Sequence, residues 1–286
     1  MNLPTSTFGP AGPSITRLGL GGEGVLRTFG RDREARDVIE AALAAGITYC
    51  DSARAYAGSE SYYGKTLGSR RETLFLATKT HDRTRSGALA MLESSLLALG
   101  CEHVDLWQVH DVRARSDLDA LDAADGVYAA CVEARERGLT RFVGVTGHQD
   151  PALLREALER FRFDSVLLPV NPAEGALPDG FERTVVPAAR ARGMAVIGMK
   201  VLARGLLAGA GVSAGDALAY ALGADVDALI VGCDDPAQLA ENVAAATQRA
   251  PMDAAARRAL ERHVAASARR LAYYRDPASD GSSSPA

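Results

Sequence analysis

The feature that most constrains this 286-residue chain is a repeated alternation of two kinds of segment. Short apolar runs that end in polar residues recur along the chain, and longer stretches with apolar residues three and four apart lie between them. The short runs cover residues 18–22, 47–51, 73–79, 104–110, 142–146, 165–171, 195–200 and 228–232. Strands that alternate with helices pair in parallel, because each return to the same edge of a sheet needs a crossover.

The longer stretches carry the periodicity of helices. Residues 31–45 place Ala35, Val38, Ile39 and Ala42 on one face, and residues 151–161 begin with a proline, which suits a first helical position. The unit at 203–221 is the least regular, because a glycine-rich loop precedes the helix that we predict from Ser213. Eight such units predict an α/β fold, a closed (β/α)8 TIM barrel, an architecture that typically takes about 250 residues.

A doubly wound parallel sheet is the alternative. That fold normally carries a Gly-x-Gly-x-x-Gly turn between its first strand and first helix. Residues 19–22 are glycine-rich, but Val25, Leu26 and Arg27 follow Gly24, so this register is absent.

We therefore expect one barrel over residues 1–250, with an N-terminal extension and an extra C-terminal helix. Residues 251–275 form the helical extension, in which 252–275 predict an Ala/Arg-rich helix packed outside the barrel. Residues 276–286 are polar and rich in Gly and Ser, a composition typical of a disordered tail.

Composition narrows the setting and the partners. The net charge of −4 gives no basic footprint for nucleic acid, and no apolar run approaches the roughly 20 residues of a membrane span. Residues 1–13 lack the pattern of a secretory signal. The cysteines, Cys50, Cys101, Cys131 and Cys233, are scattered without disulfide or zinc spacing. We expect a cytoplasmic protein that acts on a small molecule.

Four polar side chains are predicted to meet at one mouth of the barrel. Barrel enzymes place their sites at the C-terminal ends of the strands. Asp51, Lys79 and His110 end three of the predicted strands, and Tyr56 lies five residues beyond Asp51. A phenol has a reference pKa of about 10, and a nearby ammonium lowers it. We expect Lys79 to act on Tyr56 in this way.

The remaining two side chains complete a proton-donating unit. Asp51 is predicted to hold Lys79 charged and oriented, and His110 to orient a carbonyl oxygen toward Tyr56. Tyr56 then protonates the developing alkoxide as a general acid, or acts as the base in oxidation. Since no side chain supplies a hydride, the chemistry implies a cofactor.

The motifs around these residues resemble those of aldo-keto reductases. The resemblance rests on residues 51–56 (Asp-Ser-Ala-Arg-Ala-Tyr) with Glu60, 77–79 (Ala-Thr-Lys), 104–110 (Val-Asp-Leu-Trp-Gln-Val-His), 144–146 (Gly-Val-Thr), Asn171, and 236–242. It covers roughly residues 15–246 in family order. It implies an aldo-keto reductase barrel, a dinucleotide across the mouth, and the catalytic tetrad Asp51, Tyr56, Lys79 and His110.

The cofactor positions that the resemblance implies depart from the family in places. The family's usual Ser-Asn at the end of the strand predicted over residues 142–146 is replaced by Thr146, Gly147 and His148. The family's usual Gln on the next strand is replaced by Leu167. The aromatic residue that stacks on the nicotinamide is replaced by Met199. The predicted cofactor contacts are Gly22, Asp51, Thr146, Gly147, Asn171, Met199, Lys200, Leu202, Gly232, Cys233, Gln238 and Asn242.

Both NADP(H) and NAD(H) remain candidates. Members that prefer NADP commonly have Lys or Arg where this chain has Gly232 and Gln238, and Asp234 and Asp235 lie close by in sequence. A 2′-phosphate favours fixed cations and is repelled by carboxylates, which lowers the expectation for NADP unless Lys200 or Arg204 compensates. Our hypothesis is that NAD is tolerated comparably or better.

The substrate is not defined beyond a carbonyl or alcohol. The predicted substrate contacts are Arg54, Tyr56, His110, Asp111 and His148, with Arg113 and Glu174 as further candidates. Two other functions stay open: a cofactor-binding regulatory barrel without catalysis, and a metal-dependent barrel hydrolase using His81, Asp82, His110, Asp111 and His148. Because Lys79 and Tyr56 would then have no role, we predict no metal. Oligomeric state is not defined by the sequence.

Overall fold

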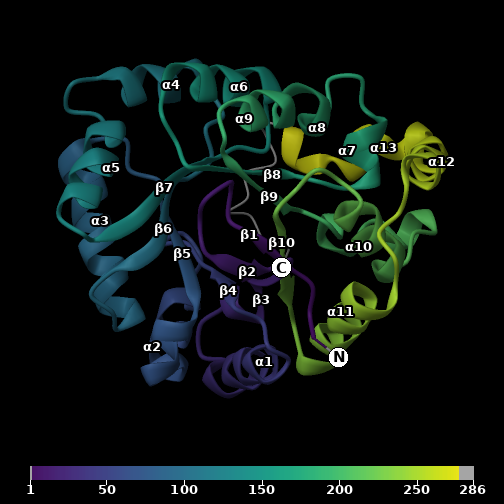
Figure 1. The fold of residues 1–286 in the computed structure, drawn as a ribbon, viewed down its shortest axis with the longest axis horizontal. Helices are drawn as coiled ribbons and strands as arrows, with labels where there is room; N and C mark the ends of the chain where they lie inside the picture. Colours follow the sequence, from purple (N-terminus) through teal and green to yellow (C-terminus); the bar gives the residue numbers. More distant parts are fainter. Residues whose placement is uncertain (1, 277–286) are drawn as a thin grey trace.

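A closed barrel of eight parallel strands forms the centre of the molecule, as a computed structural model that describes residues 2–276 shows (Figure 1). The strands are β3 (Leu18–Gly24), β4 (Tyr49–Asp51), β5 (Phe75–Thr80), β6 (Val104–Val109), β7 (Thr140–Thr146), β8 (Ser165–Pro169), β9 (Ala195–Met199) and β10 (Ala228–Cys233). They pair in chain order, and β10 pairs with β3 to close the barrel. The predicted TIM barrel is therefore confirmed, with strand ends shifted by at most two residues.

Helices form the outer layer around these strands (Figure 1). They are α1 (Asp32–Ala44), α2 (Ser59–Leu67), α3 (Arg85–Leu99), α4 (Arg115–Asp122), α5 (Val127–Glu136), α6 (Pro151–Arg160), α7 (Pro172–Ala176), α8 (Phe181–Thr184), α9 (Val186–Ala191), α10 (Ala214–Leu222) and α11 (Pro236–Gln248). Side-chain caps start several of them: Asp150 accepts from the amide of Ala152 at 2.8 Å at the start of α6, and Ser213 caps α10.

The N-terminal extension closes one end of the barrel. β1 (Thr5–Thr7) and β2 (Ser14–Thr16) form an antiparallel hairpin, and Phe8 between them is buried. Its ring lies 4.6 Å from that of Phe75 and 5.0 Å from that of Phe142. Because Phe75 begins β5, the hairpin covers the N-terminal ends of the strands.

The C-terminal extension differs from the single outer helix that we predicted. It consists of α12 (Ala254–Val264), α13 (Ala268–Leu271) and 3-10 turns at Ala265–Ser267 and Tyr273–Arg275. Its apolar residues, among them Leu271 and Tyr274, are buried in one cluster with Ala173 of α7 and the loop after β9. The chain therefore turns inward toward the barrel mouth. The tail predicted at 276–286 lies outside the described residues except for Asp276.

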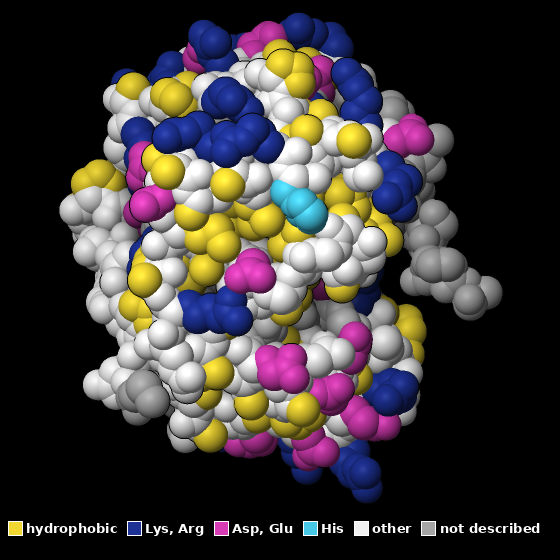
Figure 2. All heavy atoms as spheres, turned by 90° about the vertical axis from the view of Figure 1, so that its right-hand side faces the viewer, with side chains coloured by type: hydrophobic (Ala, Val, Ile, Leu, Met, Phe, Trp, Pro, Cys, Tyr) yellow, Lys and Arg dark blue, Asp and Glu magenta, His cyan; other side chains and the backbone are white. Residues whose placement is uncertain are grey.

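The surface over α10, α11 and α12 carries charges of both signs. Figure 2 shows this face, where basic side chains gather toward its upper part and acidic ones toward its lower part. Among residues 2–276, none of the helices has the length and apolar character needed to cross a bilayer.

Candidate active site

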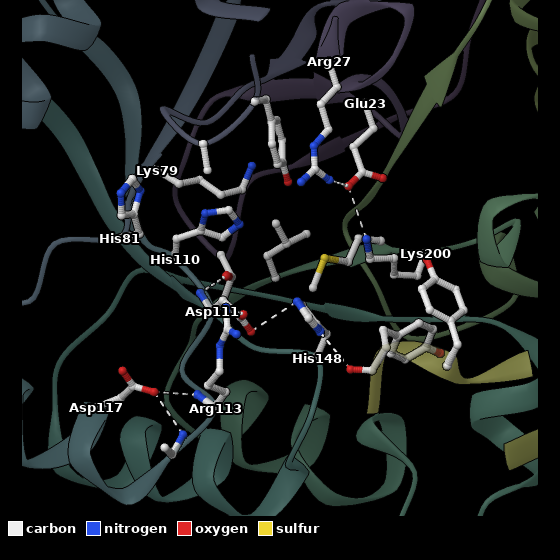
Figure 3. Close-up of a pocket in the computed structure, with 18 of the residues that line it drawn as sticks. Glu23, Arg27, Lys79, His81, His110, Asp111, Arg113, Asp117, His148 and Lys200 are labelled. Atoms are coloured by element: carbon white, nitrogen blue, oxygen red, sulfur yellow. Dashed lines mark hydrogen bonds and ion pairs between the residues drawn. The ribbon is translucent and has the colours of Figure 1, made fainter. Parts of the chain in front are cut away.

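A cavity of about 550 Å³ opens at the C-terminal ends of the strands, where we predicted the site. Tyr56, Lys79 and His110 all line it. The fourth predicted catalytic residue, Asp51, lies fully buried beside Lys79 and does not line the cavity. Figure 3 shows Lys79 and His110 side by side, with Glu23 and Lys200 further across the cavity. The barrel thus brings the four side chains together.

Asp51 and Lys79 form a buried ion pair. The Lys79 ammonium donates hydrogen bonds to the Asp51 carboxylate and, at 2.7 Å, to the carbonyl oxygen of Ser52. Gln108 of β6 donates to the other Asp51 oxygen at 3.3 Å. Burial raises the pKa of Asp51 and lowers that of Lys79, and their mutual attraction opposes both shifts. The predicted support of Lys79 by Asp51 is present in the geometry.

Tyr56 differs from our expectation in the direction of its pKa. The Lys79 nitrogen lies 4.9 Å from the centroid of the Tyr56 ring. Burial nevertheless raises the pKa of Tyr56 well above its ordinary value, and the carboxylates of Glu23 and Asp51 raise it further. Because Asp51 offsets the charge of Lys79, the cation that most opposes this rise is Arg27. Tyr56 is therefore protonated at neutral pH, in the form that donates a proton.

His110 is held as a neutral imidazole. Its ring meets that of Tyr56 edge to face, with the two centroids 5.7 Å apart. Burial lowers the pKa of His110 well below its ordinary value, and the nearby cation Lys79 lowers it further. A neutral imidazole has one N–H, which suits it to donate a hydrogen bond to a carbonyl oxygen.

The predicted substrate residues separate into two groups. Asp111, His148 and Arg113 line the cavity together: the His148 Nε2 atom lies 3.2 Å from Asp111, and Arg113 forms an ion pair with the same carboxylate. Arg54 and Glu174 do not line it. Arg54 pairs with Glu60 at 2.9 Å, and Glu174 is buried against Arg275. The structure therefore does not place Arg54 or Glu174 in the cavity.

The predicted cofactor residues extend from the cavity past β10 to α11. Thr146, Met199 and Lys200 line the cavity. Gly22, Gly147, Asn171, Cys233 and Asn242 are buried, Leu202 and Gly232 are half-buried, and Gln238 is exposed. At Gly22 a Cβ atom would lie 2.9 Å from the Tyr56 ring and 2.6 Å from the Ser59 hydroxyl, so this position needs a glycine.

Asn171 has protein partners on both ends of its amide. Its oxygen accepts from the amide of Glu174 at 3.0 Å, which caps α7. Its nitrogen donates to the carbonyl of Lys200 at 3.0 Å and to the hydroxyl of Tyr274 at 2.9 Å. In this structure Asn171 therefore ties β8 to the loop after β9 and to the C-terminal segment.

Sequence reasoning missed part of the cavity wall. Glu23, Arg27, Arg83, Tyr273 and Tyr274 all line it. Burial opposes ionisation of Glu23, but Lys200, Arg27 and Arg204 together lower its pKa to about 2. Glu23, near the end of β3, and Arg27, just after it, are four residues apart, and this spacing of opposite charges was the signal that could have identified them. The paired tyrosines at the end of an Ala/Arg-rich run were the signal for the C-terminal wall.

Arg83 fixes the loop that follows His110. Its guanidinium donates to the carbonyl oxygens of His110 at 2.8 Å and Asp111 at 3.0 Å, and it pairs with Asp117. Asp111 has a φ of 57°, a left-handed conformation that is unfavourable for a residue with a side chain. Across residues 2–276, His, Cys, Asp and Glu side chains do not gather in groups of three or more that could hold a metal ion.

Comparison with known proteins gives a consistent family match. The model of the aldo/keto reductase family matches residues 17–217. An aldo-keto reductase of Mycobacterium avium is 31% identical over 54% of this chain and 55% of its own length. The aldo-keto reductase str7 of Strobilurus tenacellus is 28% identical over 73% of this chain and 64% of its own length. The match thus spans between half and two thirds of these relatives.

Solved structures match over more of the chain. The holo form of the aldo-keto reductase AKR11C1 from Bacillus halodurans has a TM-score of 0.78, with 23% identity over 92% of this chain and 96% of that one. The thermostable aldo-keto reductase Tm1743, solved with the inhibitor epalrestat, has a TM-score of 0.72, with 25% identity over 91% of this chain and 100% of that one.

Proposed function

This chain belongs to the aldo/keto reductase family, and we propose that it transfers a hydride between a nicotinamide dinucleotide and a small aldehyde, ketone or sugar-like carbonyl, or the corresponding alcohol. The observation that supports this proposal best is the meeting of a phenol, an ammonium and an imidazole in one open cavity. Tyr56 lines that cavity together with Lys79 and a neutral His110.

The residues around the cavity fit a dinucleotide. Met199 and Leu167 give an apolar surface next to the cations Lys200 and Arg204. At Gly232 a Cβ atom would lie 2.8 Å from the backbone of Glu23, so the chain packs closely here and only a residue without a side chain fits. Met199 and Thr146 would hold the nicotinamide, and Lys200, Arg204, Gly232, Gln238 and Asn242 would hold the phosphates and the adenosine. When bound, the cofactor supplies or accepts the hydride.

We propose that NAD serves comparably to NADP or better. Lys200 is paired with Glu23 at 3.3 Å, so part of its charge is already offset. Asp234 and Asp235 are exposed after β10, near the predicted adenosine contacts. A 2′-phosphate there would face carboxylates. Titration of the purified protein with NADH and NADPH tests this, and a large preference for NADPH would refute it.

The chain's own residues account for the proton transfer. The neutral His110 donates a hydrogen bond to the carbonyl oxygen and directs it toward Tyr56. Tyr56 then gives its hydroxyl proton to the developing alkoxide. Lys79 stays charged beside Asp51 and helps to stabilise the phenolate left behind. In alcohol oxidation the same groups work in reverse, with the Tyr56 phenolate as the base.

Tyr56→Phe is the direct test. Loss of the general acid lowers turnover by about 10²- to 10⁴-fold, while binding of the cofactor, measured by fluorescence titration, is retained. Tyr128→Phe on α5, outside the cavity, is the matched control and keeps full turnover. Turnover would be followed at the reduced-nicotinamide absorbance band on a panel of carbonyls and alcohols. Retained activity in Tyr56→Phe would contradict the proposal, and binding without any turnover would favour a regulatory barrel.

A further inference from the structure

A second set of charges lies next to Tyr56, separate from Lys79 and Asp51. Arg27 follows β3 in a 3-10 turn, Val25–Arg27, and the centre of its guanidinium lies 5.2 Å from the centroid of the Tyr56 ring. Arg27 also donates to the Glu23 carboxylate at 3.1 Å, and the same carboxylate oxygen lies 3.3 Å from the Lys200 ammonium. Figure 3 shows this chain of contacts from Arg27 through Glu23 to Lys200.

The backbone holds Arg27 in this position. Gly24 has a φ of 69°, which turns the chain sharply after β3. The amide of Gly58, in the loop that carries Tyr56, donates to the carbonyl of Thr28 at 3.0 Å. A Cβ atom at Gly58 would lie 2.4 Å from that oxygen, so the two loops are in close contact. The loop with Arg27 and the loop with Tyr56 therefore form one unit.

We propose that Arg27, oriented by Glu23, is a positioning residue for the acid–base role of Tyr56. This inference rests on the proposed function. When Tyr56 donates its proton, its O–H bond breaks, an O–H bond forms on the alkoxide, and a phenolate remains. A guanidinium near the ring stabilises that phenolate, whereas the Glu23 carboxylate destabilises it. Glu23 orients Arg27, and the two charges act on Tyr56 in opposite directions.

Other charged and titratable groups also face Tyr56. They are Asp51 and Lys79 from the buried pair, and His110 and Asp111, the two residues directly after β6. Lys79 is matched by Asp51, and His110 is neutral. Arg27 and Glu23 are partly exposed, with 25% and 28% of their side-chain surface accessible. Because they are reachable without opening the core, single-charge substitutions there test the proposal with little damage to the fold.

The experiment compares Arg27→Gln and Glu23→Gln in alcohol oxidation at saturating cofactor. In that direction the rate rises with pH as the Tyr56 phenolate forms, which gives the pH–rate profile a rising limb. A shift of about one unit in the pKa of Tyr56 changes the fraction of phenolate on that limb about tenfold. Arg27→Gln moves the rising limb to higher pH and lowers the rate on that limb by about 3- to 10-fold. Glu23→Gln moves the limb to lower pH and raises the rate by about threefold. Arg27→Lys keeps the limb near its original position.

The opposite signs distinguish an electrostatic role from a structural one. If the pair only held the loop, both substitutions would lower the rate without moving the limb, and that result would overturn the inference. Arg31→Gln is the matched control, because Arg31 forms an exposed pair with Glu34 at 2.9 Å and does not line the cavity. If Tyr56→Phe is also fully active, the proposed function itself fails. If Tyr56→Phe is inactive but the rising limb moves in neither Arg27→Gln nor Glu23→Gln, only the inference about Arg27 and Glu23 fails.

Discussion

The two ends of the barrel are built from different chemistry on the same strands. At the N-terminal ends, the rings of Phe8, Phe142 and Tyr49 pack around that of Phe75, with centroids 4.6–6.1 Å from it. At the C-terminal ends, charged side chains line an open cavity. Residues on one β-strand thus serve packing at its start and chemistry at its end, as Tyr49 and Asp51 of β4 illustrate. A barrel separates stability from function along its axis.

The buried ion pair of Asp51 and Lys79 is the exception, because it lies at the catalytic end and also contributes to stability. Its loss should give the largest effect. Lys79→Met leaves the buried Asp51 carboxylate without its cation, so we expect a loss of about 3–5 kcal/mol in the free energy of unfolding, together with loss of turnover. Urea unfolding and steady-state kinetics measure the two effects. The control Lys65→Met removes an exposed pair with Asp32, and we expect it to leave the free energy of unfolding almost unchanged. A stable Lys79→Met protein would show that Asp51 is not ionised there.

Substitutions at the N-terminal end of the barrel, under the hairpin, should lower stability without changing turnover. Phe8→Ala removes a buried ring from the aromatic cluster and lowers the free energy of unfolding by about 3 kcal/mol. We expect unchanged turnover well below the melting temperature, because the cavity lies at the other end of the strands. Phe29→Ala, at a ring that is 80% exposed, is the control with little effect. A matching loss of turnover in Phe8→Ala would contradict the separation of the two ends.

The charged end should also make stability depend on pH. The pKa of His110 is lowered in the folded protein, so below its ordinary value of about 6.5 the unfolded chain binds a proton that the folded chain does not. Stability therefore falls as pH drops below that value, and His148 contributes in the same direction. His110→Asn flattens the change in urea midpoint between about pH 7.5 and about pH 5.5. An unchanged slope would show that His110 takes up a proton while folded.

The smallest effect is expected where the C-terminal segment joins the mouth. The hydroxyl of Tyr274 accepts from Asn171 at 2.9 Å and donates to Glu174 at 3.1 Å. Tyr274→Phe removes both bonds but leaves Asn171 and Glu174 their other partners, Lys200 and Arg275, so we expect a loss of about 1 kcal/mol in the free energy of unfolding. Thermal unfolding measures it. A loss several times larger would show that this segment supports the whole mouth.

The local pattern of the sequence was enough to predict the fold and the meeting of four side chains at one mouth of the barrel, and their catalytic roles stay a prediction. Strand and helix periods are short-range properties, so the ends of the eight strands were predicted to within two residues. Asp51, Lys79 and His110 were identified because each ends or directly follows a strand, and parallel strands bring those ends together. Arg54 and Glu174, which we predicted as substrate contacts, do not line the cavity, because a charge in a loop does not show which partner it faces.

Only the tertiary structure decided the state of those residues and the walls around them. The sequence predicts a lowered pKa for Tyr56 from the nearby lysine, but burial and the carboxylates reverse the direction. Lys200 meets Glu23 across 177 positions of sequence, and Tyr274 meets Asn171 across 103. Proton affinity depends on desolvation and on every charge within a few ångströms, and such neighbours are assembled by folding. Spacing along the chain therefore identifies the groups, and packing in three dimensions sets their charge.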